Sequence, residues 1–152
     1  MKIRGVRIDR RRKCFHLDLG RKGVLDFPFA RCEPVPTRED PAVEAFVDPE
    51  LAREGMTFRL ASGAEGVVLA DQALDYHSDP DYLRDLLLYR LTLEARDRKE
   101  TSRLGVRTLG RRLGTSPAQI YRLLDPTNYR KSVDQMLRLL HALDAKVEVT
   151  VT

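Results

Sequence analysis

Residues 105–124 constrain the fold most, because Gly110, Gly114 and the Ser116-Pro117 pair interrupt their helical pattern at short intervals. Two short helices can cross closely only where a bulky side chain is missing, and Gly110 meets this need. The turn that follows requires a positive φ, which Gly114 adopts readily. Ser116 can then cap a second helix whose first residue is Pro117. The spacing predicts a helix, a tight turn and a second helix.

Apolar side chains at matching intervals would hold these two helices together. The positions with the required spacing are Leu109, Leu113, Ile120 and Leu123. With these four inside, the second helix presents Pro117, Ala118, Tyr121 and Arg122 outward. A bihelical unit of this kind places the second helix in the major groove of DNA. An ordinary helical hairpin with a glycine turn is the alternative, but it does not need this combination of features.

The outward residues divide into two groups by the DNA atoms that they can reach. Arg122 can donate two hydrogen bonds to guanine O6 and N7, and Tyr121 can contact a phosphate or a thymine methyl group. The candidates for reading bases are Ala118, Gln119, Tyr121 and Arg122. The candidates for contacting the DNA backbone are Arg107, Arg111, Arg112, Thr115, Ser116, Asn128, Arg130 and Lys131.

The positive charge is concentrated in the same part of the chain. Residues 81–131 hold 12 Lys or Arg and 6 Asp or Glu, a net charge of +6, whereas residues 1–80 and 132–152 each carry a net charge of −1. A patch of this kind attracts a polyanion, because each neutralised phosphate releases condensed counterions. A solvated charged surface remains the alternative on charge alone.

Residues 82–145 resemble the lambda-repressor-like or Xre-type helix-turn-helix family. The resemblance rests on residues 107–116, 120–124 and 136–143, although Gly110 stands where the family has alanine and Pro117 takes a base-reading position. It implies a homodimer that binds a palindromic operator on double-stranded DNA. A sequence-specific transcriptional regulator, a repressor for example, is the expected function. Because Xre-type antitoxins carry a similar tail, an autoregulating antitoxin that neutralises a toxin protein is the alternative.

The pattern before residue 79 is mostly that of β-strands. Hairpins are predicted around the turns at 20–23 and 62–66, and four prolines between positions 28 and 41 exclude a central strand there. The hairpins, with Asp71 and Tyr76, resemble the small DUF2442 domain. Residues 48–55 fit a helical turn or a loop.

Between the second hairpin and the paired glycines, a helix is expected from residue 80 to about 99, with Leu83, Leu86, Leu87 and Leu91 facing the core.

These patterns predict an α+β protein in three parts. A β-rich domain at 1–78 would dimerise, sense a ligand or bind a partner, and an all-α helix-turn-helix domain would occupy 79–145. The tail at 146–152 alternates strictly and predicts a β-strand with Val147, Val149 and Val151 on one face.

Several other classes of protein are not expected. No nucleophile elbow, phosphate-binding loop or dinucleotide glycine pattern is present, so we expect no enzyme. Cys14, His16 and Cys32 match no zinc spacing, and we expect reduced thiols and no metal or cofactor. The apolar runs are too short to cross a bilayer, which predicts a cytoplasmic protein without a membrane partner.

Overall fold

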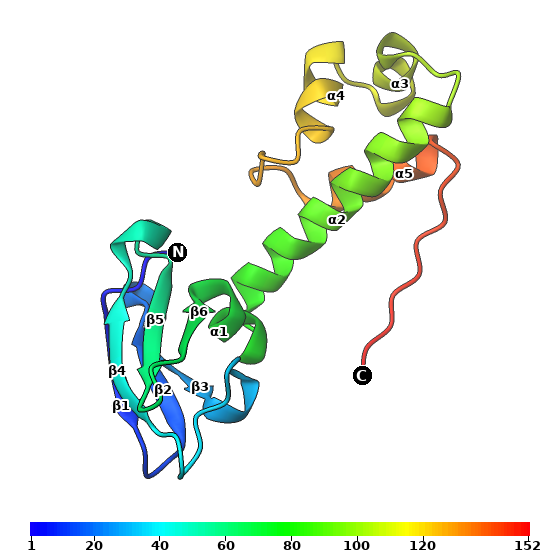
Figure 1. The fold of residues 1–152 in the computed structure, drawn as a ribbon. Coiled ribbons are helices and arrows are strands. Elements are labelled where there is room, and N and C mark those ends of the chain that lie inside the picture. Colours follow the sequence, from blue (N-terminus) through cyan, green and yellow to red (C-terminus); the bar gives the residue numbers. More distant parts are fainter. The chain divides into compact units, whose positions relative to one another are not determined.

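The structure, a computed structural model, describes residues 1–152 and contains six strands and five α-helices. The predicted α+β class is confirmed. The chain forms two compact units, Met1–Tyr82 and Leu83–Thr152. The first unit contains all six strands, and the second contains three complete α-helices and most of a fourth (Figure 1).

The first sheet is an antiparallel meander in the order β1-β2-β3. A turn of 3-10 helix at Gly20–Lys22 joins the second and third strands, and its first residue, Gly20, and the residue after it, Gly23, have positive φ. The hairpin predicted around this turn is confirmed. The strand bounds are Gly5–Asp9 for β1, Cys14–Asp18 for β2 and Val24–Pro28 for β3.

The second sheet has the order β4-β5-β6 and is also antiparallel. Its bounds are Ala42–Val47, Gly55–Leu60 and Glu65–Leu69. The hairpin of β5 and β6 was predicted, but β4 was not, because the prolines that end at Pro41 hid the start of an edge strand. The intervening segment contains a 3-10 turn at Pro49–Leu51, capped by the Asp48 carboxylate. The helical turn is therefore the correct alternative for this segment.

Aromatic side chains from the two sheets form the centre of the first unit's core. The Phe15 ring of β2 lies 5.0 Å from the Phe58 ring of β5 and 4.9 Å from the Phe29 ring. Alternation along β2 sends Phe15 and Leu17 into this core, so Cys14 and His16 lie on the opposite face of the sheet.

Helix α1, at Ala70–Tyr76, was not predicted. The second hairpin was expected to run to Ala70, but β6 ends at Leu69, and Gln72 accepts a hydrogen bond from the Leu69 backbone N–H. A helix of this length has little intrinsic stability, so the burial of Ala73 and Leu74 holds it in place.

The second unit is a small helical core around α2, α3, α4 and α5. Asp79 caps α2 by accepting a hydrogen bond from the Tyr82 N–H, and Ser132 caps α5 in the same way through Gln135. The bounds are Pro80–Thr101 for α2, Val106–Leu113 for α3, Pro117–Leu123 for α4 and Val133–Ala142 for α5. Buried leucines of all four helices, with Ile120 and Met136, form the core.

The prediction of which face of α2 is buried is largely wrong. Leu83 and Leu87 are 42% and 45% exposed, and of the expected stripe only Leu91 is buried. The buried side chains are those of Leu88, Leu91, Thr92 and Ala95, which follow helical spacing. Leucines occur on every side of this helix, so periodicity alone could not select the face.

The C-terminal strand predicted at 146–152 does not form. These residues have no regular secondary structure, and Val149 and Val151 are almost fully exposed. The alternation of side chains is present, but a strand also needs a neighbour to accept and donate its backbone hydrogen bonds. The tail finds none within this chain.

Candidate nucleic-acid interface

The turn between α3 and α4 depends on two glycines. Gly114 ends α3 in the left-handed conformation, with φ of 65°. The Thr115 N–H then donates to the Gly110 carbonyl over 2.8 Å, which folds the chain back onto the end of α3. Gly110 is buried, and a Cβ placed there would lie 2.8 Å from the Thr115 carbonyl oxygen. The close approach predicted at Gly110 is therefore with the backbone of the turn.

The start of α4 matches the sequence prediction. The Ser116 hydroxyl accepts a hydrogen bond from the Gln119 N–H at 3.2 Å, and Pro117 is the first helical residue. Leu109, Ile120 and Leu123 are buried in the core that α3 and α4 share with α5, whereas Leu113 is half-buried. These contacts fix the direction in which the outer face of α4 points.

Three of the four candidate base-reading side chains are freely exposed on α4. Tyr121 is 65% exposed, and Ala118 and Arg122 are also exposed, while Gln119 is half-buried. Tyr121 and Arg122 therefore project from α4 and do not pack inside the protein. A side chain must be free in this way before it can reach the edge of a base.

The arginines of α3 form the basic border of this surface. Arg107, Arg111 and Arg112 are exposed, and none of them pairs with a carboxylate. Among the two candidates in the turn, Thr115 is half-buried, and Ser116 is exposed but uses its hydroxyl oxygen for the helix cap. The three arginines are thus the strongest candidates for contacting phosphates.

The loop after α4 is fixed to the helix by Asn128. Its side-chain amide donates to the Arg122 carbonyl at 3.1 Å, and its oxygen accepts from the Arg130 N–H at 3.0 Å. Arg130 is exposed and unpaired with a carboxylate. Together with Gln119 and Arg122, these residues line an open hollow of about 580 Å³ beside α4.

Lys131 does not fit its predicted role as a backbone contact. The side chain is buried, with 6% exposure, and its ammonium donates to the Leu123 and Asp125 carbonyls at 2.8 and 2.9 Å. Burial lowers the pKa of Lys131. We expected an exposed lysine because the loop is polar and basic, whereas the Lys131 ammonium satisfies carbonyls at and just after the end of α4.

The hollow also contains two polar residues that sequence reasoning missed. Thr127 donates from its backbone N–H and its hydroxyl to the Asp125 carboxylate, and these hydrogen bonds lower the pKa of Asp125. Gln135 accepts from the Ser132 N–H and completes a capping box on α5. The Ser-x-x-Gln spacing is the signal that could have identified Gln135.

Comparisons with protein-family models, curated proteins and solved structures found no match for this chain. None of the helices combines the length and apolar character needed to span a membrane. The case for a function therefore rests on the residues and geometry of the chain itself.

Proposed function

We propose that the protein is a sequence-specific double-stranded DNA-binding regulator of transcription. The observation that carries the proposal is the exposure of Tyr121 and Arg122 on α4, next to a turn that Gly110 and Gly114 make tight. In bihelical DNA-binding units, the second helix enters the major groove while the first crosses the phosphate backbone. Helices α4 and α3 would take these two roles.

The two sets of exposed side chains would contribute in different ways. Arg122 would recognise a guanine through two hydrogen bonds, and Tyr121 would contact a thymine methyl group or a phosphate. The unpaired arginines of α3 would neutralise phosphates and release counterions, which adds affinity without sequence preference. Base reading and electrostatic anchoring can therefore be tested separately.

The first experiment identifies the preferred sequence by selection from a random pool of duplex DNA. Binding of Arg122→Ala to the selected site should then weaken by about 1–3 kcal/mol, with relaxed preference at one base pair. Arg112→Ala should weaken selected and unrelated DNA about equally, and should reduce the slope of log affinity against log salt by about 1. Arg138→Ala, which removes an exposed arginine of α5 that pairs with Asp134 at 3.1 Å, is the control for loss of positive charge outside α3 and α4.

Two results would refute the proposal. One is a failure of the selection to enrich any sequence. The other is a pattern in which Arg122→Ala and Tyr121→Ala bind the selected site as tightly as Arg138→Ala does.

The proposal includes a homodimer on a palindromic operator in the cytoplasm. Two copies of α4 related by a two-fold axis would contact half-sites separated by about one helical turn, roughly 34–36 Å. Footprinting on the selected DNA should therefore protect two inverted half-sites. Protection of a single half-site by one chain would contradict the dimer but not the identity of the reading helix.

The exposed tail favours a second candidate function, in which the protein is an antitoxin that binds a toxin protein. Val147, Val149 and Val151 alternate with polar residues and have no partner strand, so the tail can add to the edge of a sheet in another protein. Co-expression with the product of the adjacent gene should yield a complex that deletion of residues 146–152 disrupts. Failure of the full chain to form such a complex or to relieve toxicity would eliminate this candidate.

A further inference from the structure

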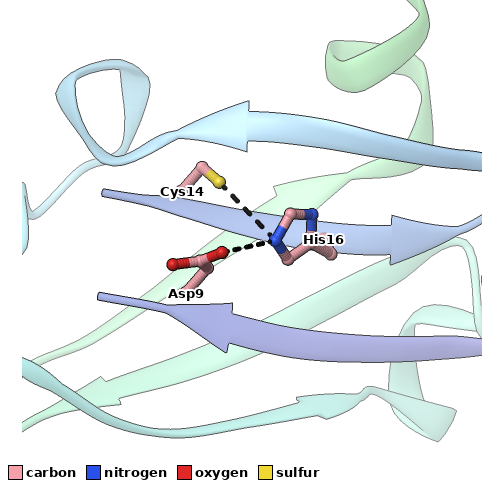
Figure 2. A group of neighbouring side chains, drawn as sticks. All are labelled: Asp9, Cys14 and His16. Carbon is pink, nitrogen blue, oxygen red and sulfur yellow. Dashed lines mark hydrogen bonds and ion pairs between the residues drawn. The ribbon is translucent and has the colours of Figure 1, made fainter. Parts of the chain in front are cut away.

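Three side chains with metal-binding atoms converge on the face of the first sheet that is turned away from the core. Asp9 ends β1 and is paired in register with Cys14, the first residue of β2. His16 follows two residues later on β2 and therefore lies on the same face as Cys14. Figure 2 shows the Asp9 carboxylate and the Cys14 thiol both directed toward one nitrogen of the His16 imidazole.

The spacing of the ligand atoms is close to that of a tetrahedral zinc site. His16 Nε2 lies 3.0 Å from Asp9 Oδ2 and 4.0 Å from Cys14 Sγ, and all three ligand atoms lie within 4.8 Å of one another. With ordinary zinc-ligand distances, the corresponding edges of a tetrahedron are about 3.4 Å for nitrogen to oxygen and about 3.5 Å for nitrogen to sulfur. Both of these distances differ from the required values by about half an ångström or less, whereas the third edge, from oxygen to sulfur, would have to close from as much as 4.8 Å to about 3.6 Å.

A fourth residue already orients the histidine. Asp26 on β3 is paired in register with His16, and its Oδ1 lies 2.6 Å from His16 Nδ1. The other oxygen of Asp26 pairs with the Arg12 guanidinium at 3.1 Å, which holds the carboxylate in position. A carboxylate that accepts the Nδ1 proton of a metal-bound histidine fixes the tautomer and directs Nε2 at the metal. Asp26 and Arg12 would act as positioning residues.

Burial and charge also suit a metal ion. Cys14 and His16 are only 5% and 7% exposed, whereas Asp9 is half-exposed, so one side of the group is open to water. A divalent ion would be neutralised by one thiolate and one carboxylate, while Arg12 balances Asp26. A mixed sulfur, nitrogen and oxygen ligand set favours zinc over magnesium or calcium, which take oxygen ligands.

We propose that Asp9, Cys14 and His16 bind one Zn²⁺ ion, with water completing the coordination shell. When the ion binds, the Cys14 thiol releases its proton, and the proton shared by His16 Nε2 and Asp9 Oδ2 also leaves to solvent, so that both atoms exchange their mutual contact for bonds to the metal. The site would link the ends of the β1–β2 hairpin, whose turn at residues 10–13 includes Lys13 at a positive φ. The proposal is independent of the DNA-binding function, since all its residues belong to the first unit.

The test is a titration of the chelator-treated full-length protein with Co²⁺, which reports its ligands by absorption. We expect one Co²⁺ per chain, sulfur-to-cobalt charge-transfer absorption, and displacement of the cobalt by Zn²⁺. Cys14→Ser should abolish the charge-transfer absorption, while Cys32→Ser, which removes the other buried thiol, should retain it. Asp26→Asn should weaken Zn²⁺ binding by about 10–100-fold and leave the stoichiometry unchanged.

The wild-type titration keeps the proposal falsifiable even if a variant fails to fold. Absence of sulfur-to-cobalt absorption in the folded wild-type protein would overturn the site. Absorption that survives in Cys14→Ser, or that is lost in Cys32→Ser while circular dichroism shows a folded chain, would do the same. Asp9→Asn provides a further variant at a half-exposed position, and it should lower Zn²⁺ affinity without unfolding the sheet.

Discussion

Replacement of Gly110 by alanine tests whether the close approach at the turn governs the stability of the helical unit. An alanine Cβ would lie 2.8 Å from the Thr115 carbonyl oxygen and 3.5 Å from the Pro117 nitrogen. Both are backbone atoms, so no side chain can rotate to make room. The hydrogen bond from the Thr115 N–H to the Gly110 carbonyl would have to lengthen or break as the turn moves away.

Two opposing effects set the magnitude. Alanine is favoured over glycine in a helix interior by about 1 kcal/mol. Insertion of a methyl group into a fully packed position costs about 1–3 kcal/mol, and an immobile backbone oxygen places this case in the upper part of that range. We therefore expect Gly110→Ala to lower the free energy of unfolding by about 1–2 kcal/mol, which corresponds to a Tm decrease of roughly 4–16 °C for a domain of this size.

The assay is thermal and urea unfolding followed by the helical circular-dichroism signal, which comes mainly from the second unit. Gly105→Ala is the matched control, because Gly105 has a negative φ and no atom lies within 4 Å of a Cβ placed there. Because Gly105 is the N-cap of α3, where glycine is preferred to alanine, that variant should lower the free energy of unfolding by about 0.5–1 kcal/mol, less than the loss expected for Gly110→Ala. An equal or higher Tm for Gly110→Ala than for the wild type would refute the packing argument and leave helix propensity as the dominant effect.

Three further predictions concern a helix cap, a carboxylate and the tail. Ser116→Ala removes the hydrogen bond to the Gln119 N–H and should cost about 1 kcal/mol in urea unfolding, whereas Ser116→Asn should restore most of the loss. The Lys22 ammonium lowers the pKa of Asp79 below its ordinary value of 3.8. The ionised Asp79 carboxylate therefore contributes its full stabilisation of the fold above that value, and this contribution disappears as the pH falls through the lowered pKa. In an acid titration of stability, Asp79→Asn should show a shallower decline than the wild type. Deletion of residues 146–152 should leave the Tm unchanged, because their only ion pair, between Lys146 and Glu148, lies within the tail itself.

The features that could be predicted from the sequence were those encoded by neighbouring residues. The end of α3 at Gly114 and the start of α4 at Ser116 depend on a local φ value and a local hydrogen bond, and both were located correctly. The two hairpins were found for the same reason, since turn glycines separate short apolar runs.

The features that were missed depend on tertiary contacts, which no local sequence pattern encodes. Strand β4 and helix α1 are held by contacts with other elements, and the tail at 146–152 has the pattern of a strand but no neighbour. Lys131 belongs to the same class, because its burial depends on carbonyls several residues earlier. The sequence analysis considered Cys14 and His16 together with Cys32 and missed Asp9, since Asp9 lies beside Cys14 only through the pairing of two strands.

The hydrogen bonds of Lys131 couple the local unfolding of α4 to the local unfolding of the loop that follows it. Helix α4 has seven residues, and an isolated helix of that length does not persist in water. Its last carbonyl, that of Leu123, accepts from the Lys131 ammonium in the segment that leads into α5, so unfolding of that segment removes a bond from the end of the helix as well. The amide protons of α4 and of residues 125–131 should consequently exchange with solvent deuterium at a shared rate, as one cooperative opening unit.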